Sequence, residues 1–343
     1  MSEYKYKNHL SIKTLLIIQF IIIVIAFMGL GLVKSIDTLY IDNNIIQTLF
    51  KAITYVGDTL VFIIIIAIIY IVYDKQYAKD LTLVLLATVY VNSILKDIFM
   101  DPRPTPNSYG DPTPENPAGL IETGYGFPSG HSQDSATFWG YISYEFKEKP
   151  KPLLVPVILS ILVFLVAFSR VIIGVHDLQD VTGGLVMGIG VLLVCIYLRP
   201  VITEKVRELS LVNKIIIGTI VSVILLVVGV IFFPTSGEQL LPNPIQYSDT
   251  GAYAQISGVL LGLSIGYVLE NEYIKYDPTR LATKHKILNL VLGLIIVFIV
   301  YYGLEALKGV FDSVIYRYIR YALITFILVF IAPLIFTKIN PKE

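Results

Sequence analysis

The chain has 343 residues, of which 55% are hydrophobic and only 15% are charged, and its mean hydropathy is +0.73. A soluble domain carries about 25% charged residues, so this composition excludes an ordinary water-soluble globule and indicates a polytopic membrane protein. The 26 basic residues balance the 26 acidic ones, which excludes a broadly basic nucleic-acid-binding protein, and the single cysteine, Cys195, excludes a disulfide framework or a cysteine-built zinc site.

Long apolar stretches recur along the chain, each close to the roughly 20 residues that a helix needs to cross a bilayer. The predicted fold class is therefore all-α, a polytopic bundle of about ten transmembrane helices. The first stretch lacks a small-residue cleavage signal and is expected to be a retained span. In chain order the predicted spans are residues 13–33, 52–73, 79–100, 129–146, 153–171, 178–198, 214–234, 252–270, 286–306 and 317–337.

The distribution of Lys and Arg predicts which loops face the cytoplasm. With the N-terminus inside, 18 of the 26 basic residues fall in inside segments and eight fall outside. This split predicts an integral, multi-pass protein of the plasma membrane with both termini in the cytoplasm.

Three short polar segments interrupt the apolar pattern, and each lies at an outer end of a predicted helix. They are Lys96-x6-Arg103-Pro104, Pro128-Ser129-Gly130-His131 and Ser169-Arg170-x5-His176-x3-Asp180. Taken singly, each has an ordinary explanation, such as a snorkelling lysine or a serine helix cap. Ionisable residues near membrane depth are costly and mark functional sites, so together, on one side of the membrane, these segments predict a single outward-facing site.

The cations of these segments suit a phosphate group. Arg103 and Arg170 carry planar guanidinium forks that match phosphate oxygens, and Lys96 adds a third fixed positive charge. Ser129 and Gly130 precede a predicted helix, whose free backbone N–H groups point at an anion.

The two histidines and the aspartate supply groups for proton transfer and nucleophilic attack. His131 follows the predicted anion site and could donate a proton. His176 and Asp180 are four residues apart and are expected to share a helix face, so the carboxylate can hold one imidazole tautomer. A histidine oriented in this way is a candidate nucleophile or base.

These segments resemble the three-part signature of the type 2 phosphatidic acid phosphatase superfamily, which also contains glucose-6-phosphatase and the vanadium haloperoxidases. Every defined position matches in order and spacing, and the resemblance covers roughly residues 50–200. A short likeness to the glucose-6-phosphatase form of the second segment begins at Glu122, a candidate for orienting or gating the substrate.

The resemblance implies a role for each matched residue. His176 would form a phosphohistidine with Asp180 orienting it, and His131 would protonate the leaving group. No metal or other cofactor would be needed, because fixed donors would hold the developing negative charge. These phosphate-binding residues would be Lys96, Arg103, Ser129, Gly130 and Arg170, supported by Pro104, Pro128 and Ser169.

The predicted organisation is a six-span phosphatase core, residues 1–200, followed by a four-span C-terminal extension, residues 201–343. The predicted function is hydrolysis of a lipid phosphate or diphosphate, such as a polyprenyl phosphate or phosphatidic acid, at the extracytoplasmic face. Alternatives are a phosphatase of soluble sugar phosphates, a lipid-linked phosphotransferase, and a transporter or scaffold with an inactive site. The intact histidines argue against the last of these.

Other residues have simpler interpretations. Asp58 and Asp134 are expected to make buried hydrogen bonds. In the eighth predicted span, Gly258, Gly262 and Gly266 recur every four residues and predict a close helix contact, either within the chain or with a second copy in a homodimer. The expected partners are the lipid phosphate substrate and membrane lipids, with no nucleic acid.

Overall fold

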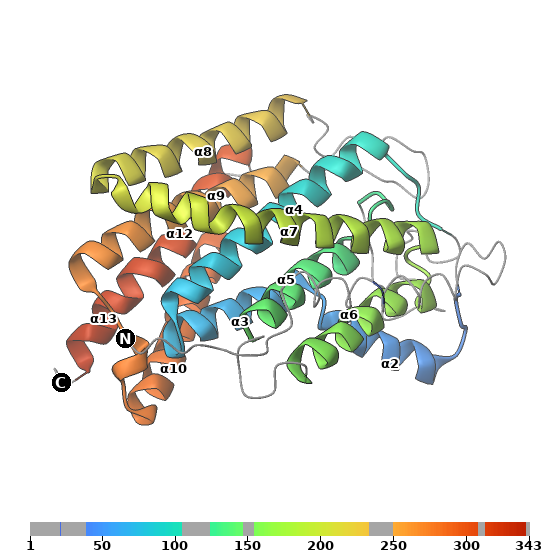
Figure 1. The fold of residues 1–343 in the computed structure, drawn as a ribbon, viewed down its shortest axis with the longest axis horizontal. Coiled ribbons are helices and arrows are strands. Elements are labelled where there is room, and N and C mark those ends of the chain that lie inside the picture. Colours follow the sequence, from blue (N-terminus) through green and yellow to red (C-terminus); the bar gives the residue numbers. More distant parts are fainter. Residues whose placement is uncertain are drawn as a thin grey trace, which may run out of the picture. The chain divides into compact units, whose positions relative to one another are not determined.

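The computed structural model describes residue 21 and residues 39–104, 124–146, 154–232, 250–307 and 313–340. Within these ranges the ordered elements are helices, with no β-strand (Figure 1). The all-α prediction is therefore confirmed.

The helices follow one another along the chain with short connections in the described ranges. In order they are α2 (Asn44–Tyr55), α3 (Thr59–Val72), α4 (Lys75–Phe99), α5 (Gly130–Phe146), α6 (Leu154–Ile172), α7 (Leu178–Glu208), α8 (Leu211–Phe232), α9 (Thr250–Leu269), the π-helix η1 (Glu270–Ile274), the 3-10 helix η2 (Pro278–Arg280), α10 (Thr283–Ala306), α12 (Val314–Phe326), the π-helix η3 (Ile327–Ile331) and α13 (Ala332–Ile339).

Seven helical stretches in the described ranges are long and apolar enough to cross a membrane, and α2 with α3 forms an eighth, broken candidate. They match eight of the ten predicted spans. The first predicted span lies outside the described residues except for Ile21, and the fourth is the polar helix α5, of only 17 residues. The chain is thus a polytopic bundle of membrane helices.

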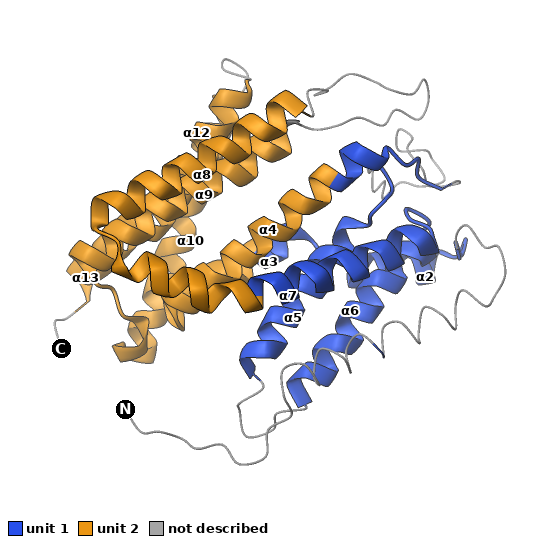
Figure 2. Cartoon of the chain, turned by 45° about the horizontal axis from the view of Figure 1, so that its top comes forward, with its two compact units in different colours: residues 1–62, 95–195, 239–246 blue, residues 63–94, 196–238, 247–343 orange. Residues whose placement is uncertain are grey.

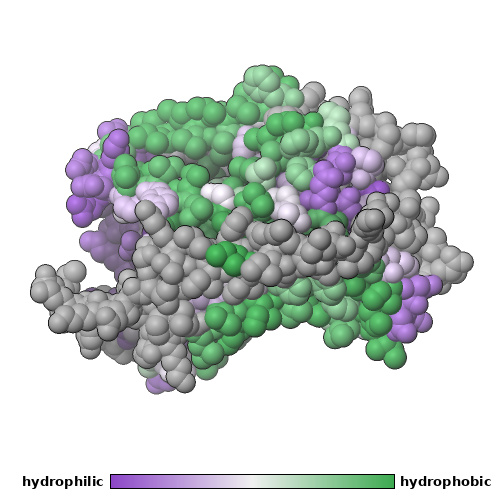
Figure 3. All heavy atoms as spheres, turned by 45° about the vertical axis from the view of Figure 1, so that its right-hand side comes forward, coloured by the Kyte–Doolittle hydropathy of each residue, from purple (hydrophilic) through white to green (hydrophobic). Residues whose placement is uncertain are grey.

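The surface agrees with this assignment. Figure 3 shows large hydrophobic areas on the face in view, although side chains this apolar are normally buried in a soluble protein. On α8, for example, Ile216, Ile220 and Ile224 are about half exposed, at 48%, 51% and 52%. Contact with lipid explains why they need no protein partner.

The chain divides into two compact units (Figure 2). Unit 1 comprises residues 1–62, 95–195 and 239–246, and unit 2 comprises residues 63–94, 196–238 and 247–343. Residues 63–94 thus pack with the C-terminal part of the chain. The predicted functional boundary near residue 200 stays a prediction.

In unit 1 the polar helix α5 is buried among other helices, which explains why hydropathy alone would miss it. Eleven of its 17 residues are buried. A close approach by α7 leaves no room for side chains there, since a Cβ added to Gly188 would lie 2.4 Å from the Gln133 carbonyl oxygen. The Thr137 hydroxyl also donates to the Gly188 carbonyl at 2.9 Å. The polar groups of α5 therefore face protein instead of lipid.

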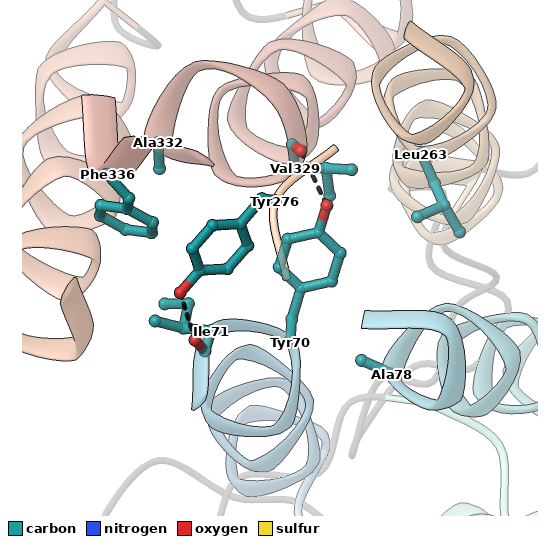
Figure 4. Close-up of a cluster of buried hydrophobic side chains, with 8 residues drawn as sticks. All are labelled: Tyr70, Ile71, Ala78, Leu263, Tyr276, Val329, Ala332 and Phe336. Carbon is teal, nitrogen blue, oxygen red and sulfur yellow. Dashed lines mark hydrogen bonds between the residues drawn. The ribbon is translucent and has the colours of Figure 1, made fainter. Parts of the chain in front are cut away.

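Unit 2 has a core in which two tyrosines combine apolar packing with hydrogen bonds to the main chain (Figure 4). The Tyr70 hydroxyl donates to the Val329 carbonyl at 2.8 Å, and the Tyr276 hydroxyl donates to the Ile71 carbonyl at 2.6 Å. The buried members of this cluster are Tyr70, Ile71, Ala78, Leu263, Tyr276, Val329, Ala332 and Phe336.

A buried ion pair lies in the same unit. The Glu270 carboxylate is fully buried and accepts from Lys75 Nζ at 2.7 Å and from the Tyr276 backbone N–H at 2.7 Å. A buried carboxylate is tolerated only when it is paired and hydrogen-bonded. These contacts tie the start of α4 to η1 and to the segment after it, which helps to place residues 63–94 in unit 2.

The glycine face of α9 packs against α12 of the same chain. A Cβ at Gly258 would lie 2.3 Å from the Tyr318 carbonyl oxygen, and a Cβ at Gly262 would lie 2.2 Å from the Ala322 carbonyl oxygen. The predicted close contact is therefore present within the chain, and this face gives no support for a homodimer.

The substitution Gly262→Ala is expected to destabilise the protein by about 1–3 kcal/mol, because backbone atoms of α12 would have to move away from the new methyl group. Thermal unfolding of the purified protein in detergent measures the effect. Gly303→Ala on α10 is the matched control, since a Cβ there meets nothing within 4 Å. A loss of stability for Gly303→Ala as large as that for Gly262→Ala would contradict the packing explanation.

Candidate active site

The three polar segments come together in unit 1, at the ends of four helices. Lys96 lies in the last turn of α4 and Arg170 in the last turn of α6, while Ser129 directly precedes α5 and Asp180 lies in the first turn of α7. The backbone N–H of Ser129 donates to the Asp180 carbonyl at 2.9 Å, which joins the second segment to the third.

Arg103 joins the first segment to the other two. Its Nε donates to the Gly124 carbonyl at 2.8 Å, and its Nη1 donates to the Val175 carbonyl at 3.0 Å. The side chain is buried, so these bonds hold the guanidinium in one position. A cation fixed in this way can meet a phosphoryl oxygen without reorganising.

His176 is held from both sides. Its Nδ1 lies 2.8 Å from Asp180 Oδ2, and its Nε2 lies 3.0 Å from Arg103 Nη1. A guanidinium can only donate hydrogen bonds, so Nε2 must accept, and the ring proton is on Nδ1, where it is donated to Asp180. Nε2, the nitrogen that contacts Arg103, therefore carries the lone pair of the ring. His176 itself lies two residues before α7, so the expected shared helix face is replaced by a turn that leads into the helix.

The environment of His176 keeps its ring neutral. Burial lowers the pKa of this imidazole well below its usual value, and the nearby cations Arg103, Arg170 and Lys96, followed by His131, lower it further. A lowered pKa means that the ring stays unprotonated until the pH falls well below the usual range. A neutral histidine with a directed lone pair is suited to nucleophilic attack.

The other two cations are also fixed by protein oxygens. Lys96 Nζ donates to the Tyr125 carbonyl and, at 3.2 Å, to the Gly126 carbonyl. Arg170 is fully buried and donates from Nη1 to the Thr54 hydroxyl at 3.0 Å. Each positive charge of the predicted phosphate site is thus anchored to a defined part of unit 1.

The second segment forms the start of α5. The Ser129 carbonyl accepts from the Gln133 N–H at 3.0 Å, and the buried Ser129 hydroxyl accepts from the Ser132 hydroxyl at 3.0 Å. Gly130 begins the helix and His131 follows in its first turn. The His131 side chain is 22% exposed, with Nε2 4.0 Å from Asp58 Oδ2. It is more accessible than the His176 side chain, which is 1% exposed.

Of the predicted supporting residues, those that the structure describes have mainly structural roles. Pro128 is buried after a cis Phe127–Pro128 peptide, and Pro104 is half-buried beside Arg103 in the chain. The Ser169 hydroxyl donates at 2.6 Å to the Val166 carbonyl of its own helix. Glu122 lies outside the described residues.

Two residues at this site were not among the predicted ones. Thr54 contacts Arg170, and Asp58 lies near His131. Thr54 has no sequence signal, whereas Asp58, expected to be buried, has a side chain 40% exposed. In the described part of the chain, no group of three or more His, Cys, Asp or Glu side chains is placed to hold a metal ion.

Two family models match the chain. A model of the PAP2 superfamily matches residues 77–204, and a model of the transmembrane extension of PAP2 superfamily phosphatases matches residues 254–343.

Three known proteins are similar to parts of the chain. Lipid phosphate phosphatase delta of Arabidopsis thaliana is 25% identical over 159 residues, which cover 44% of this chain and 38% of that protein. Phosphatidylglycerophosphatase B of Bacillus subtilis is 36% identical over 93 residues, covering 25% of this chain and 43% of that protein. Dolichyldiphosphatase of Saccharomyces cerevisiae is 33% identical over 128 residues, covering 36% and 50%. The matched region thus spans half or less of each relative.

The signature segments and the family models agree. The first model includes all three segments, which the structure brings to one site, and the second accounts for the C-terminal helices that carry no signature residue. The chain therefore belongs to the PAP2 superfamily and carries its transmembrane extension.

Proposed function

We propose that this protein is an integral membrane phosphatase that hydrolyses a lipid phosphate or diphosphate through a phosphohistidine on Nε2 of His176. The observation that carries the proposal is the placement of His176 between Asp180, at 2.8 Å from Nδ1, and Arg103, at 3.0 Å from Nε2. This arrangement leaves the Nε2 lone pair pointing at a buried, fixed cation.

In the first step, the Nε2 lone pair attacks phosphorus while the bond from phosphorus to the ester oxygen breaks. The phosphoryl group takes the place of the direct contact between Arg103 and His176, and its oxygens receive hydrogen bonds from the fixed cations. His131 gives a proton to the leaving oxygen. The Nδ1 proton stays in its hydrogen bond with Asp180, whose negative charge offsets the positive charge that develops on the ring.

In the second step, water attacks the phosphohistidine. His131, now without its proton, accepts a proton from the water while the bond from phosphorus to Nε2 breaks. Inorganic phosphate leaves, and Nε2 regains its lone pair. In both steps Lys96, Arg103 and Arg170 offset the charge on the phosphoryl oxygens.

The proposed substrate class is a lipid phosphate or diphosphate. Its support is the location of the candidate site at the ends of membrane helices and the names of the relatives, which describe a lipid phosphate phosphatase, a phosphatidylglycerophosphatase and a dolichyldiphosphatase. A substrate whose apolar chain stays in the bilayer reaches such a site by moving within the membrane plane.

Phosphate release by the purified protein from a panel of substrates tests the function. The panel contains phosphatidic acid, phosphatidylglycerol phosphate, polyprenyl phosphate and diphosphate, and glucose 6-phosphate, each with and without EDTA. We expect release from at least one lipid substrate, unchanged by EDTA. Preference for glucose 6-phosphate would overturn the lipid assignment, EDTA-sensitive release would overturn the metal-independent mechanism, and phosphate transfer to an added alcohol without free phosphate would indicate a phosphotransferase.

We further propose that the site faces the outside of the plasma membrane, with both termini in the cytoplasm. The 18-to-8 distribution of basic residues supports this orientation. The same assay on sealed right-side-out vesicles tests it with a water-soluble phosphate ester that does not cross the membrane. Cleavage only after the vesicles are opened would contradict an outward site.

A further inference from the structure

We infer that the bend between α2 and α3, residues 54–58, is a fourth part of the catalytic site, in which Thr54 positions Arg170 and Asp58 positions His131. This inference rests on the proposed phosphatase function. The bend lies outside the three signature segments and before residue 77, where the match to the superfamily model begins.

Thr54 provides the first of the two contacts. It lies in the last turn of α2, is 1% exposed, and its hydroxyl oxygen accepts from Arg170 Nη1 at 3.0 Å. A guanidinium has five donors and no acceptor, and Arg170 is fully buried, so its orientation depends on the acceptors around it. The Thr54 hydroxyl belongs to a different helix from Arg170 and fixes that end of the fork.

Gly57 fixes the position of the bend. A Cβ at this residue would lie 2.4 Å from Val166 Cγ1 on α6 and 2.8 Å from Ser135 Oγ on α5. The backbone of the bend therefore lies directly against α5 and α6, two of the four helices that carry site residues. Because α5 carries His131 and α6 carries Arg170, side chains on either side of Gly57 can reach both.

Asp58 provides the second contact, and its two oxygens have different roles. Oδ1 accepts from the Leu60 N–H at 2.8 Å and caps α3, whereas Oδ2 lies 4.0 Å from His131 Nε2. At this distance the Asp58 carboxylate and the His131 ring do not form a hydrogen bond, so they interact through charge. A carboxylate here attracts the protonated imidazole, which is the form that gives its proton to the leaving oxygen.

The first experiment compares Thr54→Val, which has nearly the same shape without the hydroxyl, with Thr54→Ser, which keeps it. Binding of inorganic phosphate and of orthovanadate is measured by calorimetry, together with kcat, KM and thermal stability. We expect Thr54→Val to weaken anion binding and kcat/KM roughly ten- to a hundredfold, as for loss of a hydrogen bond to a charged group, and Thr54→Ser to restore both.

The matched control is Thr48→Val on the same helix, because the Thr48 hydroxyl bonds only to the Asn44 carbonyl of its own turn, at 2.7 Å. We expect it to bind anions as the unmodified protein does. Unchanged anion binding in Thr54→Val, or an equal loss in Thr54→Ser, would overturn the role of Thr54, since a merely structural contact would change thermal stability without changing affinity.

The second experiment uses Asp58→Asn, which keeps an acceptor for the Leu60 N–H and removes the charge. Two substrates are compared: an alkyl phosphate, whose leaving oxygen needs a proton, and 4-nitrophenyl phosphate, whose leaving group does not. We expect kcat/KM to fall about tenfold for the alkyl ester, a fraction of the full general-acid effect, and to change little for the nitrophenyl ester.

Asp74→Asn is the control, because Asp74 Oδ1 caps α4 in the same way, accepting from the Gln76 N–H at 2.7 Å, and lies in unit 2. Equal losses for both substrates, or none, would overturn the role of Asp58. If the unmodified protein is active and the Thr54→Val and Asp58→Asn variants bind anions and cleave esters as it does, this inference is refuted and the proposed function is not. An unmodified protein that neither binds phosphate nor cleaves any ester would refute the proposed function and the inference with it.

Discussion

His176→Ala is expected to reduce turnover by at least about 10⁴-fold, because it removes the imidazole whose Nε2 accepts from Arg103 and leaves no nitrogen at that place to form the covalent intermediate. The unmodified protein, quenched during turnover of a ³²P-labelled substrate, is expected to show acid-labile, base-stable label on the protein. The variant is expected to show none. The turnover rate and the ³²P label on the protein together separate loss of the nucleophile from weaker substrate binding.

The control for this variant has to show that the protein still folds and inserts. Removing His176 takes one hydrogen-bond partner from each of the buried residues Asp180 and Arg103, so membrane insertion and a monodisperse elution profile are measured alongside activity. His285→Ala, in the first turn of α10 in unit 2, is the matched histidine variant and is expected to be active. Full activity of a well-folded His176→Ala protein would refute the histidine-nucleophile mechanism.

The parts of the structure that sequence predicts are those with a local signal. A long run of apolar residues is itself enough to predict a membrane helix, and the predicted spans for α6, α8, α9 and α10 agree with the observed bounds within a few residues. The exception is α7, which continues to Glu208, ten residues beyond its predicted end at 198. The signature segments are recognised by the fixed spacing of their residues. Because each segment was predicted to lie at a helix end on the same side of the membrane, the sequence also predicted that the three segments form one site.

The contacts that sequence does not predict are formed between distant residues without a motif. Thr54 and Arg170 are 116 residues apart, and nothing about a threonine in a helix indicates that it will hold a guanidinium. Likewise, Lys75 and Glu270 are separated by 195 residues, and their ion pair helps to join residues 63–94 to the C-terminal helices. Such pairings depend on packing, which a single sequence with no periodic signal does not reveal.

Asp180→Asn is expected to lower kcat by roughly 10³- to 10⁴-fold while leaving the affinity for inorganic phosphate nearly unchanged, by analogy with loss of the aspartate from a catalytic triad. Formation of the bond from Nε2 to phosphorus makes the imidazole ring positive. The carboxylate that accepts from Nδ1 is fully buried, so water does not screen its charge, and an amide cannot replace it. Single-turnover kinetics and phosphate binding by calorimetry measure the two quantities.

Asp80→Asn is the matched control, since Asp80 is another buried carboxylate, paired with Arg199 at 2.7 Å and located in unit 2. Its substitution is expected to reduce thermal stability without slowing the chemical step. If Asp180→Asn weakened phosphate binding as much as it lowered kcat, Asp180 would act on the phosphate site as a whole. If kcat fell alone, the charge of Asp180 would act on the transition state, as expected for a carboxylate that contacts the nucleophile directly.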